Sequence, residues 1–199
     1  MDRPPARERR RRVGLSGHSG DVDTARAHLD DSDATVRVAA LGALRRLDRL
    51  TTAEIAAGLA DPSTSVRIAA LEIAATQPTP EIAQLLHDPD PAVVEAAAWA
   101  LGERSPTPLA TVHALMQVAT QHDDALARES AVAALGAIGD HRGLPAILHA
   151  TRDKPAVRRR AVIALSAFEG PEVDAAWQRA RHDHDRQVRE AVDELLGPE

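Results

Sequence analysis

The side chains with the greatest potential for chemistry in this sequence are nine histidines, several of which stand directly before an aspartate. The clearest case is the run His182-Asp183-His184-Asp185. Imidazole and carboxylate groups are common ligands of divalent transition metals, so His182 and His184 are the best local candidates for a metal site. However, turns favour aspartate and tolerate exposed histidine. We therefore expect no metal site and no bound cofactor.

Other kinds of catalytic site have even less support. The chain contains no cysteine, which excludes thiolate catalysis, disulfides and cysteine-ligated zinc. It has no Gly-x-Ser-x-Gly nucleophile motif and no GxxxxGK phosphate loop. Its many carboxylates fall mostly at helix starts and turns, so no catalytic pair stands out. We expect no catalytic residues and a protein that is not an enzyme.

Composition limits the elements that could position any site. Of the 199 residues only 2% are aromatic (Trp99, Phe168 and Trp177), whereas 44% are hydrophobic, most of them alanine, leucine and valine. Such residues favour closely packed helices over sheets and leave little material for an aromatic-lined cofactor pocket. No apolar stretch approaches the roughly 18 residues that span a bilayer, and no signal peptide is apparent, so we expect a cytoplasmic protein.

Six segments of the chain repeat one pattern. They begin at Asp33, Ser63, Asp90, Asp124, Lys154 and Asp185. Each places a small apolar anchor residue three positions later. Further apolar residues follow four, five and eight positions after the anchor in the first five segments, and four and eight positions after it in the sixth, which is helical spacing with one apolar face. Five of the six begin with a residue that caps helix N-termini well. A shorter apolar helix precedes each segment, so the sequence predicts six helix pairs.

The two ends of the chain differ from the middle. Residues 1–12 carry six arginines against Asp2 and Glu8, so they hold +4 of a net charge of −6 and the remainder holds −10. We expect residues 1–19 to be a basic, disordered arm and residues 20–199 to be the repeat domain. In the last repeat Asp193 stands five positions after the anchor, where the other repeats have an apolar residue. A polar residue here is expected for a terminal capping repeat.

The run D-x-x-V-R-x-x-A-x-x-A-L-G, which reads well in the first, second, fourth and fifth repeats, resembles HEAT repeats, in particular the short HEAT-like repeats of phycobilin lyases. The resemblance covers about residues 20–197. It implies a right-handed, armadillo-like helical solenoid of about six helix pairs. It also implies a structural ladder of arginines that pair with turn aspartates of neighbouring repeats: Arg37, Arg67, Arg128, Arg158 and Arg189. Val94 interrupts this column in the third repeat.

Three activities of related helical-repeat proteins find little support in these residues. Hydroxylases of HEAT architecture hold two irons with repeated His-Glu pairs, and this sequence has no His-Glu dipeptide. Phycobilin lyases must handle a tetrapyrrole, for which the few aromatic residues offer little stacking surface. DNA glycosylases of related architecture need a basic groove with several aromatics, which the acidic repeat domain opposes.

Helical geometry predicts which residues of the second helix in each pair face away from the core. They include an exposed Trp99 flanked one turn away by Glu95 and Glu103, an arrangement typical of an interaction hot spot, although a partly buried packing role is equally consistent with the sequence. Trp177 is expected in the core or cap. The complete set of candidate partner-binding residues is Ile68, Glu72, Glu95, Trp99, Glu103, Glu129, Arg159, Ile163 and Glu190.

These observations favour a non-catalytic protein–protein interaction scaffold or adaptor. Its acidic face suits a basic or amphipathic partner segment. Two alternatives stay open: a lyase-like enzyme or enzyme accessory subunit, and a nucleic-acid tether that uses the basic N-terminal arm. The arm could also occupy the protein's own acidic face as a pseudo-ligand.

Overall fold

The computed structural model describes residues 4–77 and 81–197, and every regular element in these two ranges is helical. The chain divides into two compact units, Met1–Ile82 and Ala83–Glu199. Both units consist of stacked helix pairs, so the expected all-α solenoid is confirmed. We call the second helix of each pair, together with α1, a B helix.

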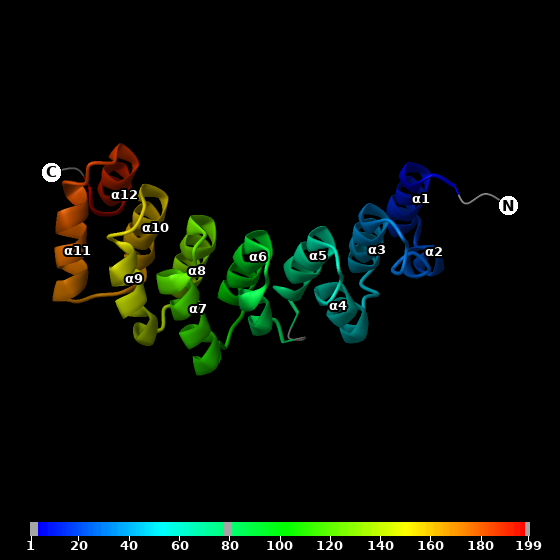
Figure 1. The fold of residues 1–199 in the computed structure, drawn as a ribbon, viewed down its shortest axis with the longest axis horizontal. Helices are drawn as coiled ribbons and strands as arrows, with labels where there is room; N and C mark the ends of the chain where they lie inside the picture. Colours follow the sequence, from blue (N-terminus) through cyan, green and yellow to red (C-terminus); the bar gives the residue numbers. More distant parts are fainter. Residues whose placement is uncertain (1–3, 78–80, 198–199) are drawn as a thin grey trace. The chain divides into compact units, whose positions relative to one another are not determined.

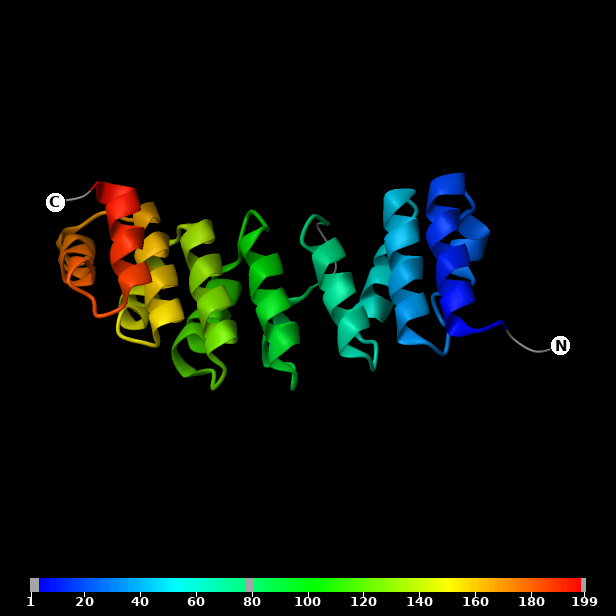
Figure 2. The same cartoon turned by 90° about the horizontal axis from the view of Figure 1, so that it is seen from above.

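Within its described residues the first unit contains five helices, drawn in blue to cyan in Figure 1. The B helices α1, α3 and α5 form one row in which α3 packs against both of the others (Figure 2). Helix α2 packs against α1 and α3, and α4 packs against α5. The bounds are α1 Ala6–Ser19, α2 Val22–Arg26, α3 Ala34–Arg46, α4 Thr52–Leu59 and α5 Thr64–Ala74.

The second unit repeats this arrangement, drawn in green to red. Its B helices α6, α8, α10 and α12 pack in order along one row, and a preceding helix covers each of them. The bounds are η1 Ala83–His87, α6 Pro91–Gly102, α7 Leu109–Gln121, α8 Ala125–Ile138, η2 His141–Gly143, α9 Leu144–Ala150, α10 Pro155–Ala164, η3 Leu165–Ala167, α11 Pro171–Arg181 and α12 Arg186–Leu196.

Four of the five predicted capping residues make the expected capping contact, whereas Ser63 stands at the N-cap of α5 without a side-chain capping hydrogen bond. Asp33, Asp90, Asp124 and Asp185 each accept a hydrogen bond from a backbone N–H in the first turn of the helix that follows. All six anchor residues are buried: Val36, Val66, Val93, Ala127, Val157 and Val188. The repeat pattern therefore records both where each B helix begins and which face it buries.

One first helix differs from the prediction. An α-helix is expected over residues 81–86, but the structure has the 3₁₀ helix η1 at Ala83–His87. This is also where the repeat spacing is shortest, 27 residues between Val66 and Val93. The shorter repeat leaves room for only a brief, tightly wound first helix. The predicted Thr-Pro start at residues 79–80 lies outside the described residues.

The larger difference concerns the basic N-terminal segment, which the sequence predicts as a disordered arm over residues 1–19. Ala6–Ser19 instead form α1, which packs on α3. Val13 and Ser16 are buried in this contact, and so is Arg9, because its guanidinium pairs with the buried carboxylate of Asp31. A small apolar stripe and one ion pair order a segment whose composition predicts disorder.

Successive B helices approach closely near their C-terminal ends because glycine stands at the contact. A Cβ atom on Gly136 would lie 2.9 Å from Cα of Ala164, and one on Gly102 would lie 2.9 Å from Cα of Ala134. Real Cβ contacts are longer, so any side chain here would push the two helices apart. Both glycines therefore set the spacing of the B-helix row in the second unit.

Candidate functional site

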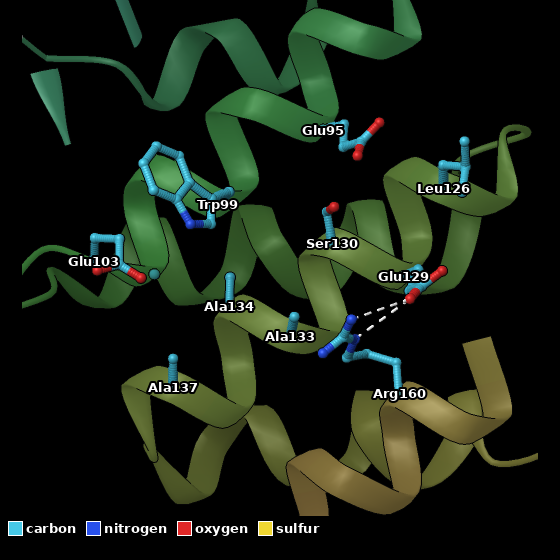
Figure 3. Close-up of a pocket in the computed structure, with 11 residues that line it drawn as sticks. Glu95, Trp99, Glu103, Leu126, Glu129, Ser130, Ala133, Ala134, Ala137 and Arg160 are labelled. Carbon is cyan, nitrogen blue, oxygen red and sulfur yellow. Dashed lines mark hydrogen bonds and ion pairs between the residues drawn. The ribbon is translucent and has the colours of Figure 1, made fainter. Parts of the chain in front are cut away.

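The B helices α6, α8 and α10 of the second unit enclose a pocket of about 380 Å³, which we call the acidic groove (Figure 3). Three glutamates and one exposed aromatic ring line it, over a floor of small residues. The full lining is Glu95, Trp99, Gly102, Glu103, Leu126, Glu129, Ser130, Ala133, Ala134, Ala137 and Arg160.

Trp99 is the largest side chain of the groove, and 46% of its surface is exposed. It projects from α6, and Glu95 and Glu103 stand one helical turn before and after it. The ring is exposed because its position faces away from the buried anchor Val93 and its neighbours on the helix. Trp99 thus offers apolar area next to two carboxylates that face solvent or partner.

Arg160 of α10 closes the opposite side of the groove. Its guanidinium lies 3.3 Å from the carboxylate of Glu129 on α8. The pair spans two neighbouring B helices and leaves Glu95 and Glu103 as the uncompensated charges of the lining. The groove is therefore acidic near Trp99 and close to neutral at Arg160.

Four of the nine predicted partner-binding residues come together here: Glu95, Trp99, Glu103 and Glu129. Ile163 lines an adjoining pocket of about 240 Å³ that shares Ala133, Ala137 and Arg160 with the groove. Arg159 is exposed on α10 but lines neither pocket. The remaining three are elsewhere: Glu190 on α12, paired with Arg186, and Ile68 and Glu72 on α5 of the first unit.

Arg160 and Leu126 also line the groove, although neither is among the binding residues predicted from the sequence. Arg160 stands three positions after the anchor Val157, on the face that also carries Trp99 in its own repeat, so helical spacing alone could have identified it. Leu126 is 57% exposed and directly precedes the anchor Ala127. At 100° per residue this position points almost directly away from the buried columns, so helical spacing could have placed Leu126 on the exposed face as well.

The arginine column forms a ladder within each unit. Arg37 donates two hydrogen bonds to the carboxylate of Asp61, from Nε at 2.8 Å and from Nη2 at 2.6 Å. The same two-bond geometry joins Arg128 to Asp153 and Arg158 to Asp183. In these last two pairs the hydrogen bond from arginine lowers the pKa of the aspartate.

Arg67 and Arg189 occupy the same column and share one feature of the ladder. Each donates from Nη1 to the carbonyl oxygen six residues earlier, Asp61 for Arg67 and Asp183 for Arg189. The ladder also has a member that the sequence analysis did not assign. Arg9 makes the two-bond pair with Asp31 and stands 28 residues before Arg37, a spacing that fits the repeat.

The candidates for other chemistry do not form a site within the described ranges. No group of three or more histidine, aspartate or glutamate side chains there is arranged to hold a metal ion.

Trp177 is half-buried, and its Nε1 donates to the carbonyl oxygen of Val162 at 3.2 Å, so it has a packing role. No helix in those ranges is long and apolar enough to cross a membrane.

Comparisons with known proteins support this architecture. A family model described as HEAT repeats matches residues 52–112, 79–155 and 112–197. Human deoxyhypusine hydroxylase in complex with glycerol has a similar structure, with a TM-score of 0.52 and 21% sequence identity over 98% of this chain and 80% of that one. At this identity the likeness is one of fold alone.

A designed armadillo repeat protein in complex with the peptide (KR)4 aligns with a TM-score of 0.47 and 14% identity, over 94% of this chain and 85% of that one. A second designed armadillo repeat protein aligns with a TM-score of 0.44 and 14% identity over the same shares of the two chains. The comparison with curated proteins found no match.

Proposed function

The chain belongs to the HEAT-repeat family, and on that premise we propose that it is a non-catalytic, cytoplasmic scaffold or adaptor that binds a protein segment in the acidic groove. The observation that carries the proposal is the position of Trp99, an exposed ring inside a pocket whose uncompensated charges are Glu95 and Glu103. Aromatic anchors surrounded by polar groups are typical hot spots of protein interfaces.

The chemistry of the groove selects the kind of partner. Glu95 and Glu103 would each pair with a basic side chain, and an apolar side chain would pack on Trp99 between them. Helical spacing places these three groups one turn apart along α6. The partner that fits is therefore a segment in which arginine or lysine residues flank an apolar residue.

The alternative of a lyase-like enzyme or accessory subunit has weaker support. A tetrapyrrole needs broad stacking surface, and Trp99 is the one aromatic side chain among the residues that line the groove. The similar fold of deoxyhypusine hydroxylase does not favour a hydroxylase activity for this chain either, because the sequence has no His-Glu dipeptide.

A binding titration with a synthetic peptide of arginine and leucine residues tests the proposal. The peptide carries a fluorescent label, and its glutamate-for-arginine counterpart serves as the reference probe. We expect the basic peptide to bind more tightly, and Trp99→Ala to weaken binding by about tenfold or more, as for other hot-spot aromatics. Glu95→Arg with Glu103→Arg should abolish the preference for the basic peptide.

Glu169→Arg provides the matched control, because Glu169 is exposed in the same unit and lies outside the groove. This variant should bind the basic peptide nearly as the parent protein does. Equal binding of both peptides to the parent protein, or equal losses in the control and groove variants, would overturn the assignment of the groove.

A further inference from the structure

Charge is segregated within the first unit. The unit as a whole is balanced, with twelve arginines and twelve acidic residues. Its two N-terminal B helices are not, because α1 and α3 together carry eight arginines and one acidic residue, Glu8. The acidic residues lie mainly in the first helices and the turns, so one face of this unit is strongly basic.

Among the residues that the structure describes, five of these eight arginines have no hydrogen-bond or ion-pair partner. Arg9 and Arg37 pair with aspartates in the ladder, and Arg12 hydrogen-bonds His28. The others are exposed and form no hydrogen bond or ion pair within the described ranges: Arg7, Arg10, Arg11, Arg45 and Arg46. Their donors are available to a ligand without the loss of any internal contact.

The five arginines lie on two adjacent helices of one row, since α1 and α3 stand side by side (Figure 2). On α1, Arg7, Arg11 and His18 recur at helical spacing along one exposed face. Arg46 of α3 reaches across to α1, where its Nη1 lies 2.6 Å from the place that a Cβ on Gly17 would take. The basic face, which we define by these five arginines and His18, therefore spans both helices.

The centre of the basic face carries no side chain. Gly14 of α1 and Gly42 of α3 each stand five residues after the arginine of the ladder column, and a Cβ on either would meet nothing within 4 Å. Trp99 stands at the equivalent position of α6, five residues after Val94. At this position of the repeat the second unit therefore has an aromatic side chain, whereas the first unit has glycine, which leaves the space above the backbone open.

We propose that the basic face binds the phosphate backbone of duplex nucleic acid without sequence preference. Guanidinium groups match phosphate oxygens with paired hydrogen bonds, and regularly spaced cations suit a polyanion. Neither α1 nor α3 contains the asparagine or glutamine side chains that read adenine, so we expect the guanidinium groups to bind mainly phosphate oxygens.

The same face fits other anions less well. Single strands bind by stacking their bases on aromatic rings, and the three such residues of the chain, Trp99, Phe168 and Trp177, are all in the second unit. An acidic peptide would need an apolar anchor at the centre of its interface, where Gly14 and Gly42 offer none. A rigid duplex needs neither feature.

The test measures the fluorescence anisotropy of a labelled, mixed-sequence DNA duplex titrated with the full chain at several salt concentrations. We expect log K to fall linearly with log salt, and each arginine that is replaced to reduce the slope by about one. Arg10→Glu should weaken binding by about tenfold at low salt. Trp99→Ala should leave it unchanged, which separates this face from the acidic groove.

Arg159→Glu is the matched control. Arg10 and Arg159 are both exposed, and each directly follows a ladder arginine on a B helix, so the two variants make the same charge change at equivalent positions of different units. Circular dichroism confirms that both remain helical. Equal loss in the two variants, tighter binding of a single strand, or displacement of the duplex by an equimolar polyglutamate peptide would each overturn the proposal, as would no binding at low salt.

Discussion

Arg9 and Asp31 form across the first helix junction the same two-bond pair that the ladder arginines form between later repeats. Nε of Arg9 donates to one carboxylate oxygen at 2.8 Å and Nη2 to the other at 2.7 Å, and Asp31 is buried. This pair ties α1 to the turn before α3, as the ladder pairs do for the later B helices.

Arg9→Ala should lower the melting temperature by several degrees, because it leaves the buried carboxylate of Asp31 without its guanidinium. Arg10→Ala is the control, since Arg10 is exposed and has no partner in the described ranges. Thermal unfolding followed by circular dichroism compares the two variants. Equal melting temperatures would show that the pair does not anchor α1.

Gly136→Ala and Gly42→Ala should change stability in opposite directions. A Cβ at position 136 would press on the backbone of Ala164 and cost about 1–3 kcal/mol through overpacking. At position 42 the space is open, and alanine in a helix interior should stabilise by about 0.5–1 kcal/mol. Urea denaturation measures both free energies of unfolding. A destabilised Gly42→Ala would contradict the open face.

Stability should fall in acid because of Asp153 and Asp183. Hydrogen bonds from Arg128 and Arg158 lower the pKa of these carboxyls in the folded state, so folding favours their ionised form. Their contribution is complete above the unfolded pKa, near 4, and is lost as the pH falls through the folded pKa. We expect the melting temperature to drop between about pH 5 and pH 2.

The double variant Arg128→Gln with Arg158→Gln isolates this effect. Without the guanidinium groups the two carboxyls should titrate nearer their unfolded pKa, so the melting temperature of the variant should depend less on pH over the same interval. The acid-induced drop in the parent protein includes other groups, but the difference between the two proteins does not. If the melting temperatures of the parent protein and the double variant depended on pH in the same way, the ladder pairs would not be the cause of the acid sensitivity.

The two tryptophans should differ in accessibility to a quencher. Trp99 is 46% exposed. Trp177 is less exposed, and its Nε1 donates a hydrogen bond to the carbonyl oxygen of Val162. Acrylamide should therefore quench Trp177→Phe, which retains Trp99, more strongly than Trp99→Phe. Trp177→Phe should also cost about 1 kcal/mol of stability through the lost hydrogen bond. The reverse order of quenching would place Trp99 in the core.

The B helices could be predicted from sequence because their anchors and caps recur at a nearly constant spacing. Val36 and Asp33 already define where α3 begins and which side it buries, and the same holds for α12 with Val188 and Asp185. The faces opposite the anchors follow from helical geometry. For this reason Trp99, Glu95 and Glu103 could be placed on one exposed surface before any coordinates were known.

Contacts that depend on the distance between helices could not be predicted in this way. Nothing local to Arg160 shows that it reaches Glu129, 31 residues away, and nothing in an arginine-rich segment shows that Arg9 will find Asp31. Helix α1 buries little beyond Val13 and Ser16, so its periodic signal is weak. Its order comes from a tertiary ion pair that composition does not record.

Gly102 has a consequence for the breadth of partners that the acidic groove would accept. It lines the groove, and its close approach to Ala134 fixes how far α6 stands from α8. A single methyl group at this position would wedge the two helices apart and widen the cleft without altering Trp99 or any charged residue. A single substitution at Gly102 would therefore change the size of the partner side chain that the groove accepts, while the preference for a basic partner stayed the same.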